Sequence, residues 1–305
     1  MTAAAGAPLR WNDVAEKGGV LGIRVLVGLT TLLGRRAGRA VLWLVAAWFV
    51  LLHAGVRRTS RAYLARVGMP TTLASVYRHV RLFAHVSLDR IFMARGDFRH
   101  FAVSSHGEEH LRDAARSGQG AIVMLAHLGS FEVMRGLADV RGLPIHVLAY
   151  SGNARRIAAA LRAMNPSIEA RVIEIRPGDP SFVFEAEDVV RRGEILGTMG
   201  DRVGLGGKSA VAPFLGAPAR FPAGPYLVAA ALGCPVLVAF GLHTPPNRYD
   251  LYCEPLADRI VLPRGAAREE ALAAWASRYA ARVEHHCRLA PYNWFNFYDF
   301  WSTDR

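Results

Sequence analysis

The sequence predicts a mixed α/β domain, with a largely parallel sheet flanked by helices, that follows an N-terminal apolar helical membrane anchor. From about residue 102 onward, short unbroken apolar runs alternate with longer amphipathic stretches. This is the pattern of buried strands connected by helices. Before residue 100, two apolar runs lie among arginine clusters. We therefore divide the chain into a basic, apolar helical region over residues 1–100 and an α/β domain over residues 101–305.

The predicted strands are short apolar runs that end at turn-forming residues, and the predicted helices are longer stretches of mixed polarity. Several strands are apolar throughout, as expected for a sheet that is covered on both faces. The strands cover residues 121–126, 145–150, 171–175, 195–199, 235–242 and 249–253. The helices cover residues 108–116, 130–140, 154–164, 181–192, 223–232 and 266–287.

The N-terminal region combines positive charge with apolar character. Of the formal net charge of +12, nearly all lies in residues 1–100, which hold fifteen Lys and Arg against four Asp and Glu. Apolar runs cover 20–33 and 40–52, and the second is short of the roughly twenty residues that a spanning helix needs. We expect a helical hairpin that lies in, or partly enters, an anionic membrane surface; a buried helix pair is the alternative. The arginines that flank the second run are Arg35, Arg36, Arg39, Arg57, Arg58 and Arg61.

Other partners and compartments are less favoured. The basic region carries no zinc-finger spacing, basic zipper or RNA-binding aromatic signature, so nucleic acid is not expected as a partner. Cys234, Cys253 and Cys287 are odd in number and widely spaced, which is typical of a reducing compartment and argues against a disulfide framework or a metal site. The first residues do not resemble a cleavable signal peptide, so we expect residence on the cytoplasmic side.

The segment that follows the predicted strand 121–126 is the main candidate for chemistry. It reads His127-Leu-Gly-Ser-Phe-Glu132. On one helix these two residues would point in different directions, but a turn at Gly129 and Ser130 can bring them together. Glu132 would then orient the imidazole, and His127 would act as a general base on a substrate hydroxyl. The alternative is a structural histidine at a strand end beside a solvated glutamate.

A glycine-rich segment over residues 200–209 follows the predicted strand 195–199. Asp201 and Arg202 therefore lie at the same sheet edge as His127, where open α/β folds bind ligands. The ending Gly-Lys208-Ser suggests a phosphate loop, but Arg202 stands where its first glycine is required, so we reject nucleotide binding. Arg202 and Lys208 are expected to contact an anionic substrate; a surface loop with solvated charges is an equal alternative.

Two further segments contribute candidates. Arg220, in a Pro- and Gly-containing stretch, is positioned to contact a phosphate or a developing oxyanion. Residues 291–301 hold seven aromatics, which we interpret as a seal of the core with partial ligand contact, a membrane-interface belt being the alternative.

In this order the segments resemble those of the bacterial lipid A late acyltransferases, the lauroyl and myristoyl transferases of the lysophospholipid acyltransferase superfamily. The likeness covers most of the chain. It rests on the basic apolar N-terminus, on residues 126–132 as an H-x4-D/E block, on the Asp201 turn followed by Gly-Lys-Ser and by residues 212–214 (Ala-Pro-Phe), and on Trp294.

The resemblance implies an O-acyltransferase on the cytoplasmic face of the inner membrane, with no metal or organic cofactor. His127 would be the general base and Glu132 its partner. The acyl donor would be a thioester of acyl carrier protein or coenzyme A, and the acceptor a lipid hydroxyl like that of a lipid A precursor.

Two departures bear on the acceptor. The chain has Asp201-Arg202 where the lipid A enzymes have Asp-Gln, and aromatic residues with Asn296 where they carry a basic cluster after the tryptophan. Aromatic residues in place of the basic cluster favour a less phosphorylated or more apolar acceptor, such as an ornithine lipid, a glycolipid or a polyene pigment precursor. A non-catalytic peripheral lipid-binding protein is the remaining alternative.

Overall fold

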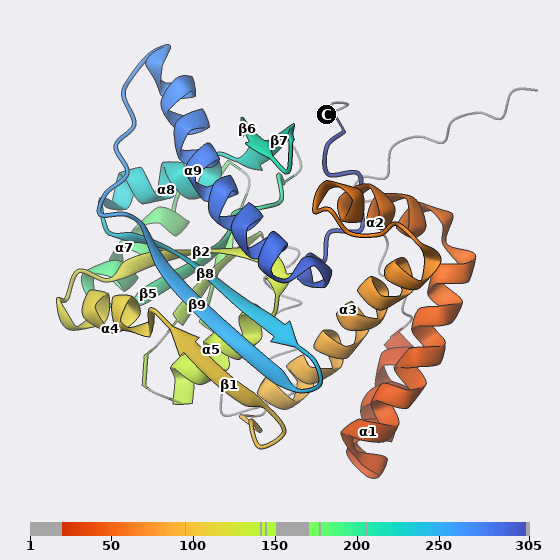
Figure 1. The fold of residues 1–305 in the computed structure, drawn as a ribbon. Coiled ribbons are helices and arrows are strands. Elements are labelled where there is room, and N and C mark those ends of the chain that lie inside the picture. The colour runs from red at the N-terminus through yellow and green to blue at the C-terminus, as the bar shows by residue number, and fades with distance from the viewer. Residues whose placement is uncertain are drawn as a thin grey trace, which may run out of the picture.

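The computed structural model describes residues 20–302, apart from 95, 141, 144, 151–170, 177 and 205–206. A seven-stranded sheet forms its centre, with the strand order β1-β9-β8-β2-β5-β3-β4 (Figure 1). All neighbouring strands are parallel except β8 and β9, which form an antiparallel pair. The predicted mixed α/β fold with a largely parallel sheet is confirmed.

The predicted strands are all present, with small shifts at their ends. They are β2 (Ala121–Gly129), β3 (Ile145–Tyr150), β4 (Val172–Ile175), β5 (Ile195–Met199), β8 (Val236–Thr244) and β9 (Arg248–Ala257). Three further strands were not predicted: β1 (Ala102–His106), and the pair β6 (Ser209–Phe214) and β7 (Ala217–Pro222). β1 is a half-exposed edge strand, and β6 and β7 contain prolines, so none of them shows an unbroken apolar run.

Helices cover both faces of the sheet. They are α4 (Glu108–Arg116), α5 (Phe131–Val140), α7 (Phe182–Arg191), α8 (Gly224–Leu232) and α9 (Ala267–Leu289), followed by a short 3-10 turn η1 (Pro291–Asn293). On β2, Val123 and Leu125 belong to the core cluster with α4 and α5, whereas Ile122 and Met124 belong to the cluster with α8 and α9. This alternation is why β2 is apolar throughout. The helix predicted over 154–164 lies outside the described residues.

Three helices precede the sheet: α1 (Val20–Leu52), α2 (Ala54–Arg66) and α3 (Leu73–Ala94). Residues 34–39, which lie between the two apolar runs of the predicted helical hairpin, do not form a loop. The break is confined to Gly34, whose φ of 82° is a left-handed value, and helix continues from there to Leu52. No single helix among the described residues is both long and apolar enough to cross a membrane, whereas the segments Gly34–Leu52 and Ala54–Arg66, bent by 96°, meet that test jointly.

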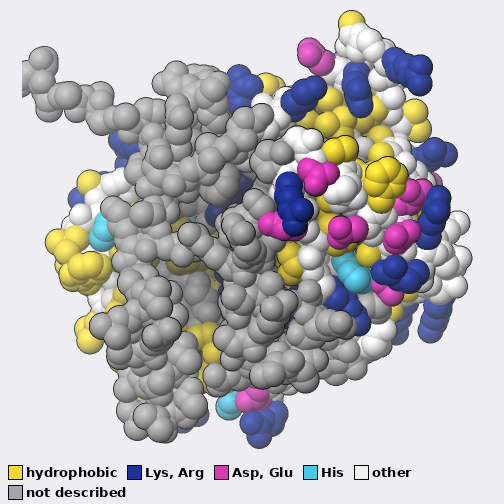
Figure 2. Space-filling model, turned by 180° about the vertical axis from the view of Figure 1, so that it is seen from behind, with side chains coloured by type: hydrophobic (Ala, Val, Ile, Leu, Met, Phe, Trp, Pro, Cys, Tyr) yellow, Lys and Arg dark blue, Asp and Glu magenta, His cyan; other side chains and the backbone are white. Residues whose placement is uncertain are grey.

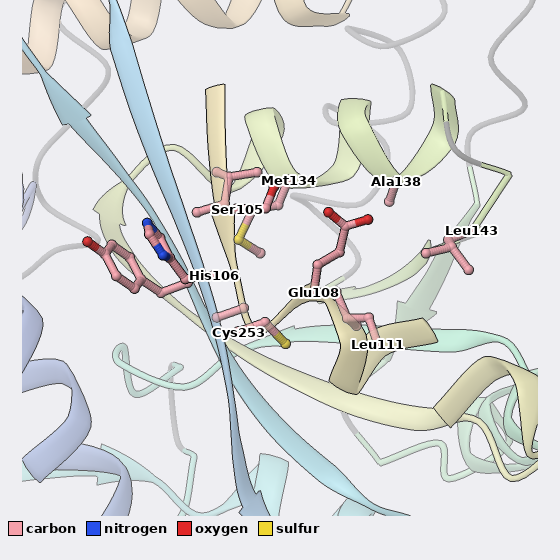
Figure 3. A pocket seen from close by; sticks show the side chains of 11 residues that line it. Ser105, His106, Glu108, Leu111, Met134, Ala138, Leu143 and Cys253 are labelled. Carbon is pink, nitrogen blue, oxygen red and sulfur yellow. The ribbon is translucent and has the colours of Figure 1, made fainter. Parts of the chain in front are cut away.

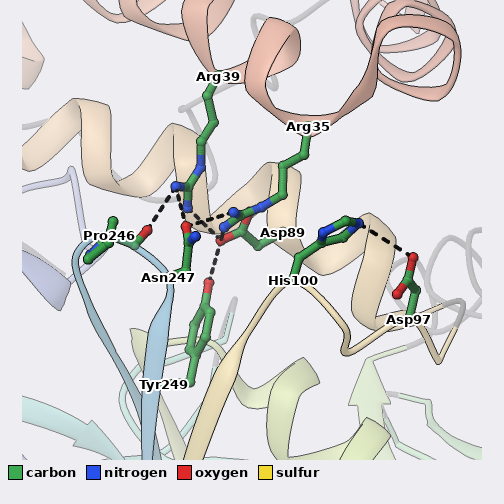
Figure 4. A network of polar contacts seen from close by, with 8 residues as sticks. All are labelled: Arg35, Arg39, Asp89, Asp97, His100, Pro246, Asn247 and Tyr249. Carbon is green, nitrogen blue, oxygen red and sulfur yellow. Dashed lines mark hydrogen bonds and ion pairs between the residues drawn. The ribbon is translucent and has the colours of Figure 1, made fainter.

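A buried polar network ties α1 to the body of the protein (Figure 4). The fully buried carboxylate of Asp89 on α3 accepts hydrogen bonds from Arg35 Nε at 2.7 Å, Arg39 Nη2 at 3.0 Å and the Tyr249 hydroxyl at 3.0 Å. Asn247 Oδ1 accepts from both arginines, at 2.7 and 2.8 Å. The expectation that Arg35 and Arg39 flank a lipid surface is therefore wrong, because Asp89 draws both guanidinium groups inward.

We predict that Asp89→Ala lowers the free energy of unfolding by about 3–5 kcal/mol, because it leaves two largely buried guanidinium groups without their carboxylate. Denaturant titration of the purified protein in a fixed non-ionic detergent measures this. Asp97→Ala is the matched control, since Asp97 pairs with the exposed Arg99 and a surface pair contributes little. Equal midpoints for Asp89→Ala and the wild type would contradict the prediction.

Candidate active site

The carboxyl ends of β2 and β5 hold the candidate site. These parallel strands are neighbours, with Leu125 opposite Met199, so His127 and Asp201 meet at one edge, as the sequence predicted. His127 Nδ1 donates to Asp201 Oδ1 at 2.8 Å, and the backbone N–H of His127 donates to Asp201 Oδ2 at 2.8 Å. One carboxylate therefore fixes both the main chain and the ring of the histidine.

The prediction that Glu132 orients His127 is wrong. Glu132 Oε2 instead accepts a hydrogen bond from Ser130 Oγ at 2.9 Å and lies 3.0 Å from Arg90 Nε on α3. The turn does form at Gly129, whose φ is 71° and where a Cβ would collide with the carbonyl of Gly241. It places Glu132 in the first turn of α5, beside α3, while the parallel pairing brings Asp201 to the imidazole.

Residues 294–296, which we call the C-terminal strap, close the site. The Phe295 N–H donates to the carbonyl of His127 at 2.8 Å, so the strap lies along the end of β2. Asn296 Nδ2 donates to Asp201 Oδ2 at 3.0 Å, and Asn296 Oδ1 accepts from Arg202 Nε at 2.7 Å. The fully buried Asp201 carboxylate thus has three hydrogen-bond donors, and Arg202 is held by the strap.

The strap is fixed from the side of the N-terminal helices. The buried His79 of α3 donates from Nε2 to the Trp294 carbonyl at 2.7 Å. Its Nδ1 lies 2.9 Å from Ser60 Oγ on α2, and because Nε2 carries the proton in the neutral ring, Nδ1 accepts from the hydroxyl. Burial lowers the pKa of His79 to about 4, so its ring is neutral at neutral pH. The neutral ring keeps both hydrogen bonds and so holds the strap in place.

Electrostatics leaves His127 neutral and oriented. Burial raises the pKa of Asp201, but the adjacent His127, Arg202 and Asn296 outweigh it and lower the pKa to about 2. Burial and the charges of Arg202 and Arg90 lower the pKa of His127 below its usual value, against the opposing effect of Asp201. An ionised carboxylate only accepts hydrogen bonds, so Nδ1 carries the proton. Nε2 then holds a lone pair, on a side chain that is 27% exposed.

Of the three basic residues predicted to bind substrate, only one lies beside His127. Arg202 is at the site, where its Nη2 donates to the Phe295 carbonyl at 3.1 Å. Lys208 is exposed. Arg220 lies on the β6–β7 hairpin, where its Nη1 donates to Ser209 Oγ at 3.3 Å. Neither Lys208 nor Arg220 contacts His127 among the described residues.

Two residues at the site were missed by the sequence analysis. Asn296 stands in the aromatic C-terminal segment, and its polar character among aromatics was the signal that could have indicated a buried role. Arg90 stands in the basic N-terminal third, where its charge was counted with the membrane-facing arginines. Nothing in the sequence around Arg90 distinguishes it from the other arginines of residues 1–100.

The cavity in Figure 3 is separate from this site. It lies between α4, α5 and the strands β1, β8 and β9, and its walls include Ser105, His106, Glu108, Leu111, Met134, Ala138, Leu143 and Cys253. Neither His127 nor Asp201 lines it. Burial raises the pKa of Cys253 to about 12, so its thiol is protonated and a poor nucleophile.

Groups that could hold a metal are absent from the part of the chain that the structure describes: no three His, Cys, Asp or Glu side chains gather there suitably. The site therefore consists of an oriented neutral histidine, a buried carboxylate and two nearby guanidinium groups.

Comparison with known families identifies the family of the chain. A family model for the bacterial lipid A biosynthesis acyltransferases matches residues 21–303. The chain belongs to this family. It is accordingly an acyltransferase that acts on a lipid acceptor, and the resemblance seen in the sequence is confirmed. No curated protein matches the chain at a significant level.

We predict that Asp201→Asn reduces kcat for acyl transfer by up to about 10⁴-fold, the effect of the same change in Ser-His-Asp enzymes, because the amide no longer enforces the Nδ1-protonated ring. Single-turnover and steady-state assays of the purified acyltransferase measure it. Asp258→Asn, at an exposed aspartate in the connection after β9, serves as the control. A kcat within a factor of about two of the wild type would refute this role for Asp201.

Proposed function

We propose that this acyltransferase moves a fatty acyl chain from the thioester of acyl carrier protein or coenzyme A to a hydroxyl of a membrane lipid, with His127 as the general base. The observation that supports this most strongly is the hydrogen bond from His127 Nδ1 to Asp201. It leaves Nε2 unprotonated on a side chain that is partly exposed, and an unprotonated nitrogen is what a base needs.

The reaction follows from that geometry. His127 Nε2 takes the proton of the acceptor hydroxyl while the oxygen attacks the thioester carbonyl carbon. The carbonyl π electrons move to oxygen and form a tetrahedral oxyanion. When the intermediate collapses, the carbon–sulfur bond breaks, and the leaving thiolate takes the proton from His127 Nε2. Asp201 stabilises the transient imidazolium throughout.

Attachment to the cytoplasmic face of the inner membrane is supported by an apolar face of α1. Six exposed apolar residues recur there at helical spacing, and Trp43 is exposed outside that face. The six are Val41, Leu44, Val45, Trp48, Leu51 and Leu52. Figure 2 views the molecule from behind and shows hydrophobic side chains gathered at its left edge. This edge corresponds to the right-hand side of Figure 1, where α1 and α2 lie. Arg58, Arg61 and Arg78 are exposed on α2 and α3, and they are suited to anionic headgroups.

One observation favours an acceptor other than a bis-phosphorylated lipid A precursor. Arg202 stands where the lipid A enzymes have Gln, yet its Nε and Nη2 bind the strap, so it supplies little extra capacity for phosphate. An ornithine lipid, a glycolipid or a polyene pigment precursor is the second candidate acceptor. Lys208 and Arg220 are proposed to contact the anionic part of the donor or acceptor.

Lipid mass spectra of cells that express the wild type and His127→Ala test the proposal. We expect one lipid class to be heavier by one acyl group with the wild type only, which also identifies the acceptor. The two proteins must be present at equal amounts in the membrane fraction. The same new lipid in both strains would contradict the role of His127, and binding without any new lipid would favour the non-catalytic alternative.

The pH dependence of kcat/KM should show an acidic limb with a midpoint below 6.5. The base must be neutral, so activity falls as the pH drops through the pKa of His127, which burial and two arginines lower. Initial rates over a range of buffers at constant ionic strength measure the midpoint. A midpoint above 6.5 would contradict the environment described for His127.

A further inference from the structure

The carboxylate of Glu132 has a partner other than the catalytic histidine. Its Oε2 atom faces Arg90 Nε at 3.0 Å and accepts from Ser130 Oγ at 2.9 Å. Ser130 is fully buried, and the side chain of Glu132 is only 15% exposed. The same oxygen makes both contacts. Because the buried hydroxyl of Ser130 holds this oxygen, the carboxylate has little freedom, and its charge keeps the guanidinium in place.

Arg90 is held along one edge only. Its Nε lies 3.0 Å from Glu132 Oε2 in an ion pair that lacks hydrogen-bond geometry, and its Nη2 donates to the Gly129 carbonyl at 3.5 Å. These two nitrogens share one edge of the planar guanidinium, so the Nη1 amino group lies at the other end. Nη1 makes no hydrogen bond to any residue in the described ranges, and the side chain is 28% exposed. Arg90 therefore presents two unused donors beside the turn that directly follows His127.

The second guanidinium near His127 is engaged differently. Arg202 is bound by Asn296 and the Phe295 carbonyl and packs near the ring of Tyr298, at 5.8 Å. Burial is the main reason that the pKa values of His127 and Arg202 are lowered. The positive charge of Arg90 lowers both pKa values further. The carboxylates of Asp201 and Glu132 balance the two guanidinium charges. An added anion would therefore be bound through the Nη1 donors of Arg90 and not through a net positive charge at this edge.

We propose that Glu132 is a positioning residue for Arg90, and that Arg90 Nη1 binds an anionic oxygen on a tetrahedral centre beside His127. Such an oxygen occurs in the tetrahedral intermediate of acyl transfer and in a phosphate group of the acceptor or donor. The carboxylate of the H-x4-E block then acts through an arginine of α3, while Asp201 orients the histidine. This inference rests on the proposed function for its role in the reaction.

The first test measures binding without turnover. Dodecylphosphonate carries anionic oxygens on a tetrahedral centre, and its affinity for the full chain in uncharged nanodiscs is measured by calorimetry. Arg90→Ala should weaken binding by about 10- to 100-fold, the value of a hydrogen bond to a charged group. Glu132→Gln should also weaken it, and should add nothing in the Arg90→Ala background. Arg191→Ala, at an exposed arginine of α7 that pairs with Glu187, is the control and should bind as the wild type does.

Two results would overturn the inference. One is unchanged phosphonate affinity in Arg90→Ala. The other is an equal loss from Glu132→Gln with and without Arg90, which would mean that Glu132 acts independently of it. Arg90→Lys keeps the positive charge but loses the planar guanidinium, so it should bind more tightly than Arg90→Ala and less tightly than the wild type. This intermediate affinity would show that the loss in Arg90→Ala is not caused by misfolding.

Kinetics then identify the source of the oxygen. If it belongs to the tetrahedral intermediate, Arg90→Ala lowers kcat by about 10²- to 10³-fold with an unchanged KM for the acceptor. If it belongs to the acceptor, the KM for that lipid rises instead. Because phosphonate binding needs no turnover, it decides the role of Arg90 even if the lipid spectra contradict the proposed function.

Discussion

A single buried carboxylate organises the active site. Asp201 is fully buried and accepts hydrogen bonds from the ring and the backbone of His127 and from Asn296. Burying an ionised carboxylate is costly unless donors surround it. Parallel pairing of β2 with β5 supplies two of these donors, and the C-terminal strap supplies the third. The position of His127, the proposed base, therefore follows from how the fold supplies hydrogen-bond donors to the Asp201 carboxylate.

The same requirement connects distant parts of the chain. The strap reaches Asp201 only because Phe295 pairs with the His127 carbonyl and because His79 binds the Trp294 carbonyl. His79 belongs to α3, which also holds α1 through Asp89 and carries Arg90. α3 thus contacts both the helix whose apolar face is proposed to meet the membrane and the residues around the reacting atoms. α3 therefore connects the sheet edge that carries His127 and Asp201 with the helix whose apolar face is proposed to meet the membrane.

Much of the sheet and part of the candidate site could be predicted from the sequence. This succeeded where a strand is a continuous apolar run and a polar motif directly follows it. β2 and β5 were found because both of their faces are buried, and the placement of His127 and Asp201 followed from parallel strand ends. Glu132 was misassigned because its proximity in sequence favoured a local contact, whereas the ring of His127 turned to a carboxylate 74 residues away. Long-range pairing of this kind leaves no local pattern.

The inward turn of Arg35 and Arg39 was missed for the same reason. An arginine beside an apolar run has the same sequence pattern whether it meets lipid or a buried carboxylate. Only the packing of α3 against α1 brings Asp89 within reach. The β6–β7 pair was missed because its prolines and the left-handed Leu215-Gly216 turn interrupt any apolar pattern.

The protonation of the His127 ring tests this account most directly. Nitrogen chemical shifts of the histidine-labelled protein, with His127 assigned by comparison with His127→Ala, report which ring nitrogen carries the proton. At neutral pH the account predicts a neutral ring with the proton on Nδ1 and a lone pair on Nε2. A ring protonated on Nε2 alone, or an imidazolium at neutral pH, would contradict it. In the first form the lone pair lies on Nδ1, which faces Asp201 and not a substrate, and in the second neither nitrogen has a lone pair.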